Sequence, residues 1–138
     1  MVRAALGQAL AELGDRRGAR HHLEAAGHLW DGLEDGRQSA LVWGAAAAIA
    51  LELGEREEAS VLYERSLQHA RRSGAQALIA TASQALGDIA RDSGRLLEAV
   101  RRYTLAHDLY ARMGSPWVAR VEAELAILRE DTGSLEKP

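Results

Sequence analysis

The chain repeats itself every 40 residues, and this internal repeat constrains its fold more than any other feature. Shifting the sequence by 40 aligns six columns of glycine, small or bulky apolar residues in one register. The columns are Gly14, Gly54 and Gly94; Ala19, Ala59 and Ala99; Leu23, Tyr63 and Tyr103; Ala26, Ser66 and Ala106; Leu6-Gly7, Ala46-Ala47 and Leu86-Gly87; and Leu10, Ala50 and Ala90. Periods of about 20–50 residues indicate an array of stacked supersecondary units.

Each column has a physical role that predicts a helical hairpin as the repeating unit. Glycine at the column of Gly54 ends one helix, because glycine accepts a left-handed backbone without steric cost. The alanine of Ala59 follows in the next helix, where its small side chain lets two helix axes approach. Tyr63, four residues later on the same face, supplies bulk to the contact. The second helix therefore packs back on the first.

Composition agrees with an all-helical chain. The 138 residues include 27 Ala, 20 Leu and 16 Arg, which are strong helix formers, and no proline precedes Pro116. Strand-forming residues are too scattered for a sheet. The sequence predicts helices at about 2–13, 16–34, 37–53, 55–73, 76–93, 95–113 and 116–131.

The columns resemble the signature of the tetratricopeptide repeat (TPR) family. The second repeat matches it with Trp43, Ala46-Ala47, Ala50, Gly54-Glu55, Ala59, Tyr63 and Ser66, and the first and third repeats match in the same register. Two departures are the period, which is about 34 residues in the family, and the absence of the family's proline. Longer repeats of this kind are similar to those in large bacterial LuxR-type and SARP-type transcriptional regulators.

The resemblance implies an all-α fold, an α-α superhelix (TPR-like solenoid) of three helical hairpins plus a C-terminal capping helix. We expect one TPR-like domain over 1–138, with repeats at about 1–35, 36–74 and 75–114, a lone helix at 115–132 and a polar tail at 133–138. Ser115 and Pro116 are suited to start the lone helix. Its apolar stripe is Val118, Val121, Leu125 and Leu128. We expect the chain to be a fragment of a larger, cytoplasmic protein.

Catalytic and metal-binding signatures are missing from the sequence. There is no cysteine and no nucleophile or phosphate-binding motif, and the net charge of −3 argues against direct nucleic-acid binding. His21, Glu24 and His28 fall on one helical stripe, which we interpret as a solvated face. No apolar run is long enough to span a membrane. We therefore expect no enzyme activity, cofactor, metal or membrane contact.

The concave groove of the solenoid is the predicted binding site. In the TPR family the first helix of each hairpin lines this groove, and the resemblance assigns to it Gln8, Glu12, Leu41, Gly44, Ala45, Ala48, Leu51, Glu52, Gln84, Asp88, Arg91 and Asp92. The seventh helix adds Val121, Glu124, Leu125 and Leu128. Some family members grip a peptide carboxylate with Lys and Asn, but this chain has no Asn and only Lys137.

The groove suits an apolar helix or extended segment that carries some Arg or Lys. We interpret the chain as a protein- or peptide-binding module, the sensor or partner-binding part of a bacterial transcriptional regulator. The alternatives are an adaptor, a dimerisation spacer, or a small helical metal-binding or hydrolytic protein, and the groove alanines can equally pack against facing helices. A symmetric homodimer through the terminal helix or the first hairpin is also expected.

Overall fold

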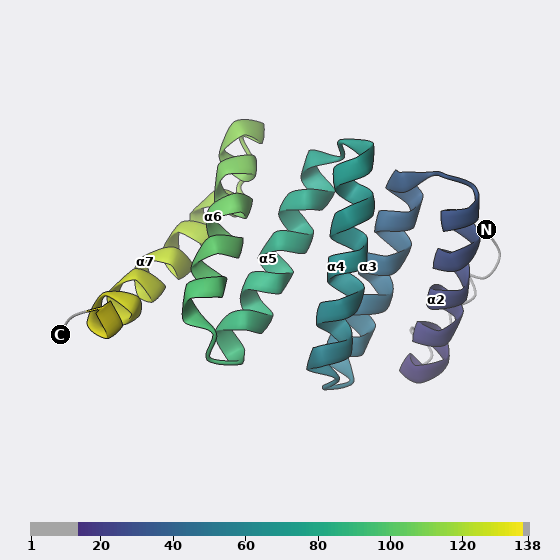
Figure 1. Cartoon of the computed structure of the whole chain (residues 1–138), viewed down its shortest axis with the longest axis horizontal. Coiled ribbons are helices and arrows are strands. Elements are labelled where there is room, and N and C mark those ends of the chain that lie inside the picture. The colour runs from purple at the N-terminus through teal and green to yellow at the C-terminus, as the bar shows by residue number, and fades with distance from the viewer. Residues whose placement is uncertain (1–13, 137–138) are drawn as a thin grey trace. The chain divides into compact units, whose positions relative to one another are not determined.

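The computed structural model describes residues 14–136, with side chains described through residue 133. This part of the chain is a succession of helices with no strand, so the all-α prediction is confirmed (Figure 1). The helices are α2 (Arg16–Gly32), α3 (Gly36–Glu52), α4 (Arg56–Ser73), α5 (Gln76–Asp92), α6 (Leu96–Met113) and α7 (Trp117–Glu136). The predicted helix at 2–13 and the predicted groove residues Gln8 and Glu12 lie outside the described residues.

The predicted helix bounds agree with the structure to within a few residues, except at the end of α7. This helix continues to Glu136 and so includes part of the segment expected to be a polar tail. Thr132 near its end is buried, and its hydroxyl donates to the carbonyl oxygen of Arg129 at 3.4 Å. At the start, the Ser115 hydroxyl accepts from the backbone N–H of Trp117 at 3.2 Å, as expected of a capping residue.

The chain divides into two compact units, residues 1–78 and 79–138, with the boundary inside α5. In the first unit α3 packs against both α2 and α4, and Figure 1 shows it between them. In the second unit α6 packs against α7 and is hydrogen-bonded to α5. Trp43 is the largest fully buried side chain of the first unit, and Tyr103 is that of the second among the described residues.

The turns repeat every 20 residues, half the period found in the sequence. Within the described residues, positive φ angles between 57° and 91° occur at Gly14, Glu34, Gly54, Gly74, Gly94 and Gly114. The predicted left-handed backbone at Gly14, Gly54 and Gly94 is therefore confirmed. Glu34 occupies the same position in the turn between α2 and α3. An L-residue in this conformation costs about 1–2 kcal/mol relative to its ordinary backbone.

The small-residue columns lie at the helix contacts, as predicted. Ala19, Ala59 and Ala99 are fully buried, as are Ala26 and Ala106. Ser66, which takes the place of alanine in its column, is buried too, and its hydroxyl donates to the carbonyl oxygen of Ala40 at 2.7 Å. A small polar residue fits there because its hydroxyl group has a partner.

Enlarging either of two column alanines should destabilise the fold. Ala59→Leu and Ala99→Leu each add three carbons at a position with no exposed surface, so each should lower the free energy of unfolding by about 1–3 kcal/mol through overpacking. Chemical denaturation measures the loss. Ala111→Leu, at an exposed position of α6, is the control and should change the stability by less than about 0.5 kcal/mol. Unchanged stability in both column variants would contradict the packing described.

The apolar stripe of α7 belongs to the core of the second unit. Val121, Leu125 and Leu128 are buried in one cluster with Tyr103 and Tyr110, and Val118 packs against this cluster. The stripe is confirmed as a packing surface. The expectation that Val121, Leu125 and Leu128 also line a binding groove is wrong, because these side chains are at most 3% exposed and pack in the core cluster with Tyr103 and Tyr110 of α6.

Candidate functional site

The predicted groove residues of the second repeat form an exposed apolar face on α3. Leu41 and Leu51 are 41% and 37% exposed, Ala48 between them is exposed, and Ala45 is half-buried. Gly44 is half-buried and lies over α4, where an added Cβ would be 3.3 Å from the Ser66 hydroxyl oxygen. Two large exposed apolar side chains flanking small ones make a shallow surface on which an apolar side chain can rest.

Glu52, the predicted acidic residue of this face, already has an internal partner. Its carboxylate accepts a hydrogen bond from the Arg16 guanidinium of α2, and both side chains are about half exposed. An exposed pair of this kind contributes little to stability, typically about 0–1 kcal/mol. It does, however, reduce the negative charge that the face of α3 presents to a partner.

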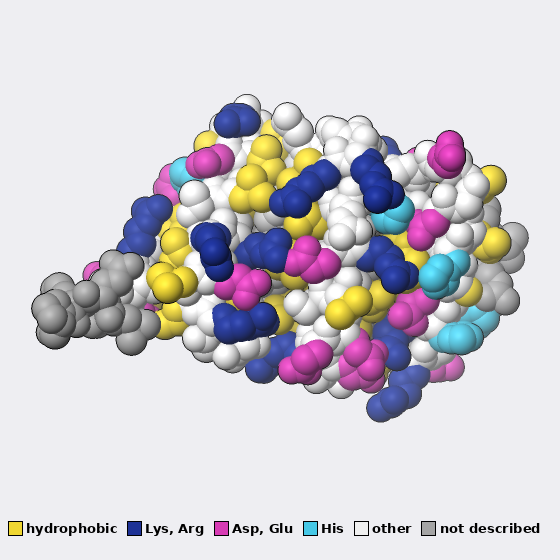
Figure 2. All heavy atoms as spheres, viewed as in Figure 1, with side chains coloured by type: hydrophobic (Ala, Val, Ile, Leu, Met, Phe, Trp, Pro, Cys, Tyr) yellow, Lys and Arg dark blue, Asp and Glu magenta, His cyan; other side chains and the backbone are white. Residues whose placement is uncertain are grey.

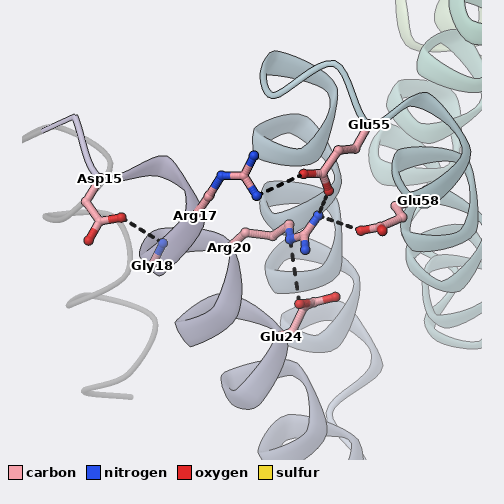
Figure 3. A network of polar contacts seen from close by, with 7 residues as sticks. All are labelled: Asp15, Arg17, Gly18, Arg20, Glu24, Glu55 and Glu58. Atoms are coloured by element: carbon pink, nitrogen blue, oxygen red, sulfur yellow. Dashed lines mark hydrogen bonds and ion pairs between the residues drawn. The ribbon is translucent and has the colours of Figure 1, made fainter.

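A second ion-pair network joins α2 to α4 and to the turn before it (Figure 3). Arg20 projects from α2 toward three carboxylates: its guanidinium pairs with Glu55, with Glu58 at 2.6 Å, and with Glu24 on its own helix at 3.9 Å. The Arg17 guanidinium also reaches Glu55, at 3.8 Å. This network fixes α2 against the end of the α3–α4 turn. It also gives Glu24, which lies on one stripe with His21 and His28, an ion-pair partner on its own helix.

The predicted groove residues of the third repeat bond to one another and to α6 and α7. Tyr103 of α6 donates its hydroxyl to Asp88, and the Arg91 guanidinium donates to the Tyr103 hydroxyl at 3.1 Å and to Glu124 of α7 at 2.9 Å. Arg91 also pairs with Asp92 at 3.1 Å. The Tyr110 hydroxyl donates to the Gln84 side chain at 2.8 Å. These side chains are therefore joined in a polar cluster that ties the three helices together.

Burial controls the ionisation of this cluster. It raises the pKa of Asp88 above its ordinary value, against the opposing effects of the Tyr103 hydrogen bond and the Arg91 charge. Burial and the Asp88 carboxylate together raise the pKa of Tyr103, which therefore stays protonated and donates. Perturbed acids of this kind are found at functional sites and also in structural networks. Here the partners are all internal, which favours a structural role.

Neutralising Asp88 should change how stability depends on pH. Because the pKa is higher in the folded protein, the folded state binds the proton more tightly, and stability falls as the pH rises from the unfolded pKa of about 3.9 through the folded value. Asp88→Asn keeps an oxygen that accepts from Tyr103 but does not titrate. The stability of Asp88→Asn relative to the parent chain, measured as the difference between their free energies of unfolding, should therefore be greater at pH 7 than at pH 3.

Denaturation at a series of pH values tests this expectation. Asp131→Asn, at an exposed position of α7, is the matched control for the loss of one carboxylate. A difference between Asp88→Asn and the parent chain that stays constant from pH 3 to pH 7, or that shifts toward the parent chain as the pH rises, would contradict the burial effect.

A further polar cluster, which the sequence analysis did not find, surrounds Trp43 in the first unit. The indole N–H of Trp43 donates to Asp31 at 3.1 Å, and the His69 Nε2 atom lies 3.0 Å from the same carboxylate. The His28 ring packs edge-on against the indole at 5.0 Å, and the Arg65 guanidinium lies 4.4 Å from the ring centre. His69 belongs to no repeat column, since the residues 40 positions before and after it are leucines, so the repeat pattern does not mark it.

The surface charges on the face shown in Figure 2 are mixed rather than gathered in a stripe. Figure 2 shows arginine and acidic side chains interleaved over the face in view. His21 and His28 are exposed on α2, and no cluster of three or more His, Asp or Glu residues suited to a metal ion occurs among residues 14–133. His107 bonds to Glu122 at 3.0 Å, which raises the pKa of the imidazole. No helix in the described part of the chain has the length and apolar character of a membrane span.

Comparison with known proteins identifies the fold. No protein-family model matches the sequence, and no curated protein matches it. Among solved structures, the apo form of RapI is similar over 96% of this chain and 48% of its own, with a TM-score of 0.85 and 14% identity. BtubC (BKLC) from P. vanneervenii is similar over 96% of this chain and 56% of its own, with a TM-score of 0.83 and 18% identity. The chain thus spans about half the length of these proteins, and it has a TPR-like helical repeat fold.

Proposed function

We propose that the chain is a non-catalytic protein-interaction module, and that its partner lies on the exposed face of α3. The observation that carries the proposal is the exposure of Leu41 and Leu51 on either side of Ala48. Apolar side chains left in solvent along one helix of a repeat protein are available to a partner. A TPR-like fold, as in the similar structures, supports the same use.

The partner that fits this face is an apolar helix or extended segment. Leu41 and Leu51 stand about ten residues apart on α3, which is roughly 15 Å of helix, or two to three turns of a partner helix. Ala45 and Ala48 between them leave room for the partner's larger side chains. The pairing of Glu52 with Arg16 supports the apolar part of the expected partner more strongly than its basic part.

The wider context that we propose is the sensor or partner-binding part of a bacterial transcriptional regulator. It rests on the similarity of the Ala- and Arg-rich 40-residue repeats to those of LuxR-type and SARP-type proteins. An adaptor or a homodimerisation segment would use the same face with a different occupant. Sedimentation at tens of micromolar separates these uses, because a dimer that is lost in Ala48→Arg would assign the face to a second copy.

Substitution of Ala48 tests the binding face. Ala48→Arg places a long charged side chain between Leu41 and Leu51 at an exposed position, so its stability should stay within about 0.5 kcal/mol of the parent chain. We expect it to bind a partner, isolated by crosslinking and then purified, at least tenfold more weakly than the parent chain does. Ala48→Glu should fold equally well and lose less binding to a basic partner.

Ala111→Arg is the matched control, since it makes the same change at an exposed alanine of α6. It should bind as the parent chain does. If Ala48→Arg unfolds, Ala48 belongs to the core and the face is assigned wrongly. If both Ala48 variants fold and bind like the parent chain, the partner uses another surface and the proposal fails.

A further inference from the structure

A cavity of about 370 Å³ lies in the first unit, where the end of α2, the start of α3 and the last turns of α4 meet. It is lined by Asp31, Glu34, Gly36, Ser39, His69, Arg72 and Ser73. An added Cβ at Gly36 would be 3.1 Å from the backbone oxygen of His69 and from the Ser73 Cβ atom. This close approach of α3 to α4 closes one side of the cavity.

Part of the cavity wall is held rigidly by internal bonds. Asp31 is fixed by the Trp43 indole N–H at 3.1 Å and by His69 at 3.0 Å. Ser73 donates its hydroxyl to the backbone oxygen of Ala70 at 3.1 Å. These groups form a wall of fixed geometry, and the Trp43 indole N–H reports on it directly.

Three other lining groups have no partner among the residues that the structure describes. Ser39 is only 1% exposed, and its buried hydroxyl has no hydrogen-bond partner. Glu34 and Arg72 are exposed at the rim of the cavity, and within the described part of the chain neither side chain forms an ion pair. A buried hydroxyl without a partner is destabilising, and so is a glutamate in the left-handed conformation that glycine holds in the other described turns. The chain therefore retains two unfavourable features in one cavity.

We propose that this cavity binds a small zwitterion, a free α-amino acid or a dipeptide. Its carboxylate would pair with Arg72, its ammonium group with Glu34, and one of its polar atoms with the Ser39 hydroxyl. Opposite unpaired charges on one cavity are complementary to a ligand that carries both charges, whereas an anion or a cation alone satisfies only one of them. The volume lies at the lower end of the range for ligand pockets, about 300–1,000 Å³.

Titration with the standard amino acids and glycylglycine, followed by the Trp43 indole N–H signal in nitrogen-15 NMR spectra, tests the proposal. At least one of them should shift this signal in a saturable manner. Its N-acetyl derivative and its amide, which each lack one charge, should bind about tenfold more weakly, the loss expected for one charge-assisted hydrogen bond. Absence of any saturable shift would overturn the proposal, and equal binding of the N-acetyl derivative would replace it with a simple anion site.

Two variants distinguish a ligand site from a merely structural one. Ser39→Ala removes the unpartnered hydroxyl, and Glu34→Gly removes both the carboxylate and the strained backbone. Each should raise the thermal midpoint of the free protein and weaken amino-acid binding about tenfold or more. Arg72→Gln should weaken binding similarly, while Arg71→Gln, one residue away and outside the cavity lining, should bind as the parent chain does. Unchanged binding in Glu34→Gly and Arg72→Gln would overturn the assignment, whatever the state of the α3 face.

Discussion

Replacing Trp43 by alanine should lower the free energy of unfolding by about 3–5 kcal/mol, the range for removal of a buried large aromatic side chain. Trp43 is 1% exposed and fills the space among α2, α3 and α4. Its loss would leave a cavity where the surrounding helices cannot easily close in, because Ala46 and Ala47 on the same helix are already fully buried. Asp31 would also lose a hydrogen-bond donor.

Denaturant titration followed by far-ultraviolet circular dichroism measures this loss. Trp117→Ala is the matched control, because Trp117 is 50% exposed at the start of α7. This substitution should lower the free energy of unfolding by less than about 1 kcal/mol. A similar loss in the two variants would contradict the central position of Trp43. A much smaller loss in Trp43→Ala than the expected range would show that the helices do collapse onto the vacated space.

Backbone and size requirements are the parts of this structure that the sequence could predict. Gly54 and Gly94 mark turns because a left-handed backbone is costly for other residues, and Ala59 and Ala99 mark helix contacts because nothing larger fits there. Both requirements repeat with the fold, so they appear as columns at a period of 40. The packing of the apolar stripe of α7 was also predictable, because apolar residues spaced at the helical period of 3.6 residues form one face that packs against the core.

Side-chain pairings across helices could not be predicted in this way. Arg20 reaches Glu58 over 38 residues and Trp43 reaches Asp31 over 12, and neither pair of residue types recurs at the 40-residue period. Repeat columns describe only what all units share, whereas these bonds belong to one unit each. The groove assignment failed at Leu125 and Leu128 because the family's groove positions were carried over to α7, whereas the apolar side chains of this helix pack in the core of the second unit.

The turn at Glu34, where glycine is replaced, could also have been predicted from the sequence, but the 40-residue alignment does not show it. Between residues 14 and 114, glycine occurs at every twentieth position (14, 54, 74, 94 and 114) except position 34, which is Glu34. A residue that breaks a rule kept elsewhere in the same chain is a signal for function, because the local cost persists only where another gain offsets it. Glu34 and the unpartnered Ser39 line the same cavity, which none of the repeat columns marks.

The second large effect is expected at Gly27, which α2 places against the indole of Trp43. A Cβ built on Gly27 would be 2.5 Å from the Trp43 Cε2 atom, closer than any real contact of this kind. The ring cannot move away freely, because Asp31, His28 and Arg65 all hold it. Gly27→Leu should therefore lower the free energy of unfolding by about 3 kcal/mol, the upper end of overpacking costs. This loss is expected even though leucine has a higher helix propensity than glycine, which by itself would add roughly 1 kcal/mol of stability.

Combining the two changes gives the sharpest test of this packing. In the double variant Gly27→Leu with Trp43→Ala, the leucine enters space that the indole has left, so each substitution relieves the cost of the other. The loss in the double variant should be smaller than the sum of the single losses by about 2 kcal/mol, within the range of coupling between residues in contact. Ala99→Leu combined with Trp43→Ala is the control pair, since the two positions belong to different units, and their losses should add within about 0.5 kcal/mol. Additive losses at Gly27 and Trp43 would show that the two residues do not face each other.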